Sequence, residues 1–136
     1  MDNRTTFLRR TLSTNGVVTL LFGAVLLVDR EMIAGWLGLA DAAPVAVGGV
    51  ICVAFAPVLF LAARKRELSV QQAFLLVAVD GAWVGASLLA AAAAPLSGIG
   101  RALVVAQAAL VAVFMVLETA GIRRMQPAGV ERVPQV

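Results

Sequence analysis

The sequence predicts an all-α fold, a bundle of four transmembrane helices that forms a single membrane domain over residues 1–136. The composition supports this prediction, because 61% of the residues are hydrophobic and only 14% are charged. Soluble domains are roughly half apolar and about a quarter charged. The mean hydropathy of +0.95 points the same way. Intrinsic disorder is excluded, since it needs low hydrophobicity and high net charge.

Four apolar stretches are long enough to cross a bilayer, which takes about 20 helical residues. They cover approximately residues 11–28, 44–63, 72–94 and 99–122, and polar or turn-forming breaks separate them. They are helical because a barrel strand has only about ten residues of alternating polarity. The segment between the first two spans, residues 29–44, is too short and too broken to cross. It predicts a short amphipathic helix on the outer face, acting as a lid or, as we favour, simply covering the end of the bundle.

The predicted orientation has both termini in the cytoplasm. Nine of the eleven basic residues lie on the side of the termini, and only Arg30 and Arg101 lie on the other side. Basic residues favour the cytoplasmic side of a membrane. The net charge of +3 therefore follows from topology and from attraction to anionic lipid, and no nucleic-acid partner is expected. No small-x-small cleavage site follows Val28, so we expect the first span to be a retained helix.

The residue types that are missing exclude several chemistries. The chain has no His and no Tyr, Cys52 is its only cysteine, and Lys65 is its only lysine. No disulfide can form within one chain, and neither a Cys/His zinc site nor a His-bound haem is possible. We therefore expect no metal and no cofactor. Lys65 belongs to the charged run 64–67, outside the bilayer core where a retinal-type Schiff base would need it.

Every predicted span has a face of small residues, which lets membrane helices approach closely. The third span contains the GxxxG pair Gly81 and Gly85, and the first contains Gly23 four residues after Thr19. The second has the series Gly48, Cys52 and Ala56, and the fourth has Ala102, Ala106 and Ala109. These faces predict a compact bundle, and they fit packing within one chain as well as a homodimer.

The polar residues inside the spans are the candidate functional residues, because ionisable groups at membrane depth are costly and often functional. Asp80 lies about eight residues into the third predicted span, near mid-membrane. Inserting an aspartate there costs about 2.5–3.5 kcal/mol, so it needs a partner. The candidate partners are Asn15, Thr19, Gln107 and Glu118, with Gln71 and Gln72 at the cytoplasmic mouth of the third span. The predicted site residues are Asp80, Asn15, Trp83, Gln107 and Glu118. Together they predict a ligand-binding or proton site, or else a hydrogen-bonded cluster that fixes helix register, which we favour.

Two of these residues have further interpretations. Glu118 lies close to Arg123 and Arg124 along the helix. In an alternative interpretation, Glu118 forms an ion pair with one of them at the membrane interface. A faint internal repeat, with Asn15-Gly16 in the first half and Asp80-Gly81 in the second, predicts that Asn15 and Asp80 lie opposite each other.

The order of these weak motifs resembles a family of small, uncharacterised bacterial four-helix integral membrane proteins. The resemblance rests on Asn15-Gly16, on the loop 35–39, on Gly48-Gly49, on Asp80 with Trp83, and on the segment 97–101. It implies a four-span fold in the bacterial inner membrane and implies no activity. The size also resembles small multidrug transporters and DoxX-like proteins. Those transporters use a glutamate in the first span, whereas this chain has its acid in the third.

Three functions are compatible with these features of the sequence. The first is a non-enzymatic accessory bundle that binds a lipophilic molecule between helices, which predicts an apolar cavity lined by Trp83. The second is a proton-coupled transporter or channel that works as a homodimer, with Asp80 as the titrating carboxyl. The third is a membrane enzyme with Asp80 or Glu118 as general acid, and it lacks a second catalytic group of complementary type. We favour the first and expect no enzymatic activity.

Overall fold

The computed structural model describes residues 3–65 and 67–125, and this part of the chain forms five helices. They are α1 (Asn3–Val28), α2 (Arg30–Leu37), α3 (Ala43–Arg64), α4 (Val70–Ala93) and α5 (Gly98–Met125). All but α2 are long and apolar enough to span a membrane, which confirms the predicted number of long apolar helices. Helix α1 begins at Asn3, ahead of the predicted residue 11, because a helix continues into its polar flank whereas hydropathy detects only the apolar part.

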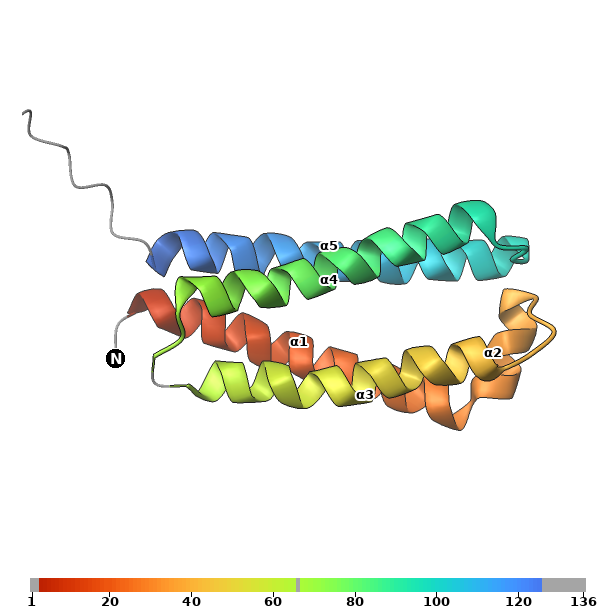
Figure 1. Ribbon diagram of the computed structural model, residues 1–136, viewed down its shortest axis with the longest axis horizontal. Helices are drawn as coiled ribbons and strands as arrows, with labels where there is room; N and C mark the ends of the chain where they lie inside the picture. Colours follow the sequence, from red (N-terminus) through yellow and green to blue (C-terminus); the bar gives the residue numbers. More distant parts are fainter. Residues whose placement is uncertain (1–2, 66, 126–136) are drawn as a thin grey trace, which may run out of the picture.

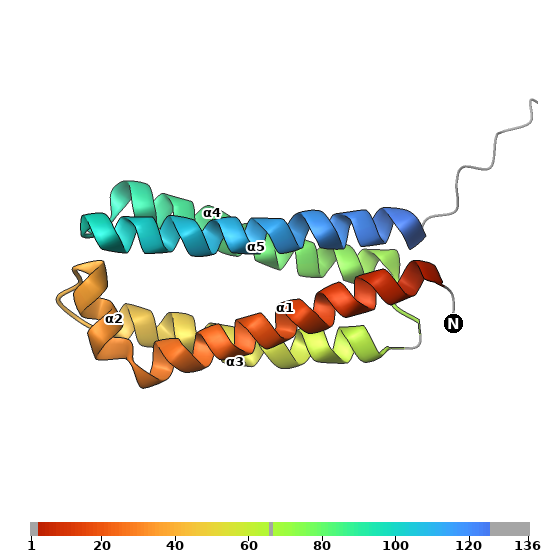
Figure 2. The ribbon, with the colours of Figure 1, turned by 180° about the vertical axis from the view of Figure 1, so that it is seen from behind.

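The long helices form two pairs that lie against each other as two layers (Figures 1 and 2). Helix α1 packs along α3, and α4 packs along α5. The two pairs meet chiefly where α1 contacts α5, whereas α3 and α4 make at most a marginal contact. The start of α1, the end of α5 and the α3–α4 connection lie at one end of the bundle (Figure 1). We call it the basic end, because its described cations are Arg9, Arg10, Arg64, Lys65, Arg123 and Arg124.

Glycines allow the close approach of α1 to α3. A Cβ added to Gly23 would lie 2.8 Å from the Cβ of Cys52 and 3.0 Å from the backbone oxygen of Gly49. A Cβ on Gly49 would lie 2.8 Å from Leu27. The predicted small-residue faces of the first two spans therefore do pack together, which is the interaction that associates membrane helices without hydrophobic drive.

The GxxxG pair of α4 divides between two environments. A Cβ on Gly81 would lie 3.2 Å from the terminal methyl of Met115 on α5, whereas nothing lies within 4 Å of one on Gly85. Only the first glycine of the motif therefore takes part in packing inside the bundle.

Helix α2 closes the end of the bundle opposite the basic end. It is the predicted amphipathic helix, with Ala34 buried and Trp36 exposed, and it packs against α1, α3 and α5. Its end is fixed to the start of α5, because the backbone N–H of Ser97 donates to the oxygen of Leu37 at 2.9 Å. A Cβ on Gly100 would lie 2.6 Å from the Leu37 backbone. The end of α2 and the start of α5, far apart in sequence, thus hold the two helix pairs together.

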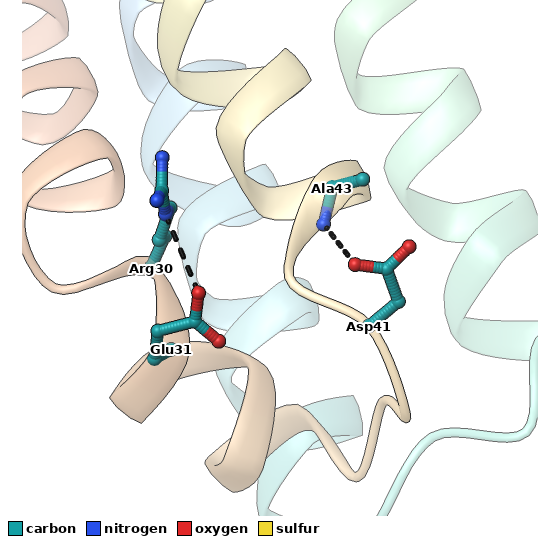
Figure 3. Close-up of polar contacts among 4 residues, drawn as sticks. All are labelled: Arg30, Glu31, Asp41 and Ala43. Atoms are coloured by element: carbon teal, nitrogen blue, oxygen red, sulfur yellow. Dashed lines mark hydrogen bonds and ion pairs between the residues drawn. The ribbon is translucent and has the colours of Figure 1, made fainter.

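The charged residues of this end lie on its surface. Arg30 and Glu31 form an ion pair of 3.5 Å, and Asp41 accepts a hydrogen bond of 2.9 Å from the backbone N–H of Ala43, at the start of α3 (Figure 3). These contacts order the ends of α2 and α3 and leave the apolar side of α2 against the bundle.

The main apolar core lies at the basic end. It brings together α1, α3, α4 and α5, so it is the place where both helix pairs share one core. Its buried members are Leu8, Leu12, Leu59, Ala62, Ala63, Ala73, Leu76 and Ile122.

Candidate functional site

A buried group of polar side chains joins the two helix pairs next to this core. The Asn15 side-chain nitrogen donates two hydrogen bonds of 2.9 Å, one to Oδ2 of Asp80 and one to Oε1 of Glu118. The hydroxyl of Thr19 donates to the Asn15 side-chain oxygen at 3.1 Å. We call Asn15, Thr19, Asp80 and Glu118 the carboxyl cluster. Asn15 is 2% exposed, Asp80 5% and Glu118 0%, so lipid and water are both excluded from its centre.

Helical spacing explains how the sequence builds this cluster. Thr19 follows Asn15 by four residues, so both lie on one face of α1. Asp80 shares its face of α4 with the buried residues Ala73 and Leu76. Asp80 lies ten residues after the first residue of α4, about 15 Å along the helix axis, which is roughly half the thickness of a bilayer core. The prediction that Asn15 and Asp80 lie opposite each other is confirmed by their hydrogen bond.

Glu118 lies inside the bundle, so the alternative that it pairs with arginines at the interface is wrong. Its neighbours along α5 at helical spacing, Phe114, Gly121 and Ile122, are also buried. Arg124 instead lies over the ring of Phe7, 4.5 Å from its centre. The sequence does not mark this face, because exposed apolar residues such as Val113 and Val116 cover other sides of α5.

The cluster has an unusual balance of charge and hydrogen bonding. Two carboxyl groups share one amide, and no basic side chain belongs to the cluster. Oε2 of Glu118 is buried, and it has no hydrogen-bond partner among the described residues. A carboxylate only accepts hydrogen bonds, whereas a protonated carboxyl also donates one. A proton on either carboxyl group would therefore add a hydrogen-bond donor to a cluster in which Asn15 supplies the two bonds to the carboxyls.

Trp83 and Gln107 belong to a second polar group, which we call the indole cluster. The indole N–H of Trp83 donates to Oε1 of Gln107 at 2.9 Å, and Nε2 of Gln107 donates to the hydroxyl of Ser87 at 2.7 Å. The far edge of the Trp83 ring reaches α3, 3.7 Å from the place where a Cβ on Gly48 would lie. Ser87 was not among the predicted site residues, although it lies four residues after Trp83 and therefore on the same helix face.

The structure thus divides the five predicted site residues between two clusters. It brings Asn15, Asp80 and Glu118 together, and it pairs Trp83 with Gln107 separately. Among residues 3–65 and 67–125, no three Cys, Asp or Glu side chains form a group that could hold a metal ion.

An apolar groove lies between α3 and α4, the two helices that barely touch. It has a volume of about 440 Å³. Its walls include Leu61 and Leu75, which are 65% and 61% exposed, so the groove opens sideways toward the surroundings of the bundle. Trp83 does not line it, in contrast to the cavity expected for a ligand-binding bundle. The lining residues are Phe55, Val58, Leu61, Ala62, Lys65, Leu68, Gln72, Leu75, Leu76 and Val79.

A smaller hollow of about 280 Å³ lies at the basic end, on the other side of Leu68. Its lining includes one cation and one anion, Arg9 and Glu67. Leu68 lines both hollows, and they differ in charge, since Lys65 is the single charged residue that lines the groove.

The fold defines the class of the protein as an all-helical protein with four helices able to span a membrane. Comparison of the chain with protein-family models, curated proteins and solved structures finds no match.

Proposed function

We propose that this protein is a non-enzymatic accessory protein of the bacterial inner membrane that binds a lipophilic molecule in the groove between α3 and α4. In this proposal both termini face the cytoplasm, because the basic end attracts the anionic cytoplasmic leaflet. The observation that carries the proposal is the groove, whose apolar walls come from two long helices with at most a marginal backbone contact. Its volume of about 440 Å³ lies within the range of small-molecule sites.

The carboxyl cluster supports this proposal through its place in the fold. Its hydrogen bonds tie α1 to α4 and α5, next to the core shared by both helix pairs. The two pairs are therefore held along one side, whereas the α3–α4 side stays open. Lipophilic ligands of membrane bundles commonly bind between helices in this way.

The experiment that tests this proposal measures the lipophilic molecules that stay with the purified protein. Leu75→Trp should fill the groove and reduce the retained lipophile, whereas Leu89→Trp should not. Leu89 is the matched control because it is also on α4, is 68% exposed and does not line the groove. Extraction and mass spectrometry quantify the lipophile per chain. Equal retention by wild type and both variants would contradict the proposal.

The carboxyl cluster favours a second candidate function, proton-coupled transport by a homodimer with Asp80 as the titrating carboxyl. The supporting observation is that two buried carboxyls share one amide while Oε2 of Glu118 has no partner among the described residues. In liposomes under a proton gradient, Asp80→Asn should abolish proton-coupled flux and leave the protein folded. Flux that persists in this variant, or that is missing in the wild type, argues against transport.

A further inference from the structure

We infer that the groove between α3 and α4 holds an acyl chain of an anionic phospholipid, whose head group lies against Lys65. This inference rests on the proposed lipophile-binding function and names the class of the ligand. It goes beyond that function because it specifies a head-group charge and the end of the bundle at which the head group lies.

The charge of the groove points to an anionic head group. Lys65 is exposed and is the single charged residue in the lining. The nearest acidic residue along the chain, Glu67, lines the other hollow together with Arg9. The groove therefore has a positive charge that its own lining does not balance. An ammonium group has three donors, and the one described contact of Lys65 Nζ is a long one of 3.5 Å to Gln72 Oε1.

The polarity along the groove matches that of a lipid. Lys65 and Gln72 mark its polar end, at the α3–α4 connection, and Val79 marks its apolar end. From Gln72 to Val79 the groove follows seven residues of α4, about 10 Å along the helix axis. Its axis is thus parallel to the spanning helices, the direction in which an acyl chain lies in a leaflet. The polar end coincides with the basic end of the bundle, where anionic lipids are attracted.

The test compares two lipids with identical acyl chains, a phosphatidylglycerol and a phosphatidylcholine, by native mass spectrometry of the full chain. The wild type should retain phosphatidylglycerol about fivefold better, the factor expected for one lysine near the membrane surface. Lys65→Gln should abolish this preference. Arg123→Gln should keep it, because Arg123 is an exposed cation at the same end that does not line the groove.

The groove-filling variant Leu75→Trp separates failure of this inference from failure of the proposed function. If Leu75→Trp reduces the retention of both lipids but the wild type retains them equally, the head-group inference is overturned and the groove remains a lipophile site. If Leu75→Trp changes nothing, both are overturned. A dimer that retains no lipid overturns both as well, because the groove would then be an interface between copies of this chain.

Discussion

Replacing Asn15 with leucine should destabilise the bundle, because two buried carboxyl groups then lose their hydrogen-bond donor. The substitution keeps the approximate size of the side chain and removes both donors, so Oδ2 of Asp80 and Oε1 of Glu118 lose their partner at once. Leaving a buried acceptor unpaired costs about 1–3 kcal/mol in soluble proteins. Side-chain hydrogen bonds in membrane bundles contribute less, about 0.6 kcal/mol on average and about 1.7 at most. For two bonds, we expect a loss of about 1–3 kcal/mol in the free energy of unfolding.

Reversible unfolding in mixed micelles, followed by circular dichroism, measures this loss. Thr14→Leu is the matched control, because Thr14 is the preceding residue on α1 and is exposed. Its stability should stay within about 0.5 kcal/mol of the wild type. The reasoning is refuted if Asn15→Leu is as stable as the Thr14→Leu control, since the cluster would then contribute nothing to joining the two helix pairs.

Three further substitutions test separate contacts. Gly23→Ala should lower the free energy of unfolding by about 1–3 kcal/mol, because the added Cβ would collide with α3. Gly85→Ala should be neutral or slightly stabilising, because nothing lies close to its added Cβ. Equal thermal unfolding of the two variants would contradict this packing. Gln107→Leu removes the hydrogen-bond acceptor of the Trp83 indole, so the wavelength of the Trp83 fluorescence maximum should shift. The measurement uses a protein in which Trp36, the other tryptophan, is replaced. An unchanged spectrum would contradict the indole cluster. Asp80→Asn should leave the free energy of unfolding nearly unchanged, because asparagine keeps an acceptor oxygen for Asn15. Asp80→Leu should lower it by about 1–3 kcal/mol in the micelle assay. Equal losses for the two variants would argue against a hydrogen-bonding role of Asp80.

The features that depend on the hydropathy of a segment and on helical spacing could be predicted from the sequence. Hydropathy alone gives the four long helices, since each apolar stretch is bounded by charges or turn residues. The amphipathic pattern of residues 29–44 gives α2. The meeting of Asn15 with Asp80 follows from their corresponding places in the two halves of the chain.

The features that depend on packing between helices could not be predicted. The nearby arginines of α5 suggested an interfacial partner for Glu118, because sequence proximity does not show which face turns inward. Gln107 was a candidate partner of Asp80, although it bonds instead to Trp83 and Ser87 in a separate group. The groove lies between α3 and α4, whose backbones make at most a marginal contact, and hydropathy does not show which of the long helices will be neighbours.

Photo-crosslinking in native membranes tests the central claim, that the open side between α3 and α4 receives a lipophilic ligand. A benzophenone amino acid is placed at Leu75, in the wall of the groove, and at Leu89 as a control that is exposed and does not line the groove. The account predicts adducts of one discrete class of lipophile at position 75 and a mixture of bulk lipids at position 89. The same mixture at both positions, or cross-links between two chains at position 75, would contradict it.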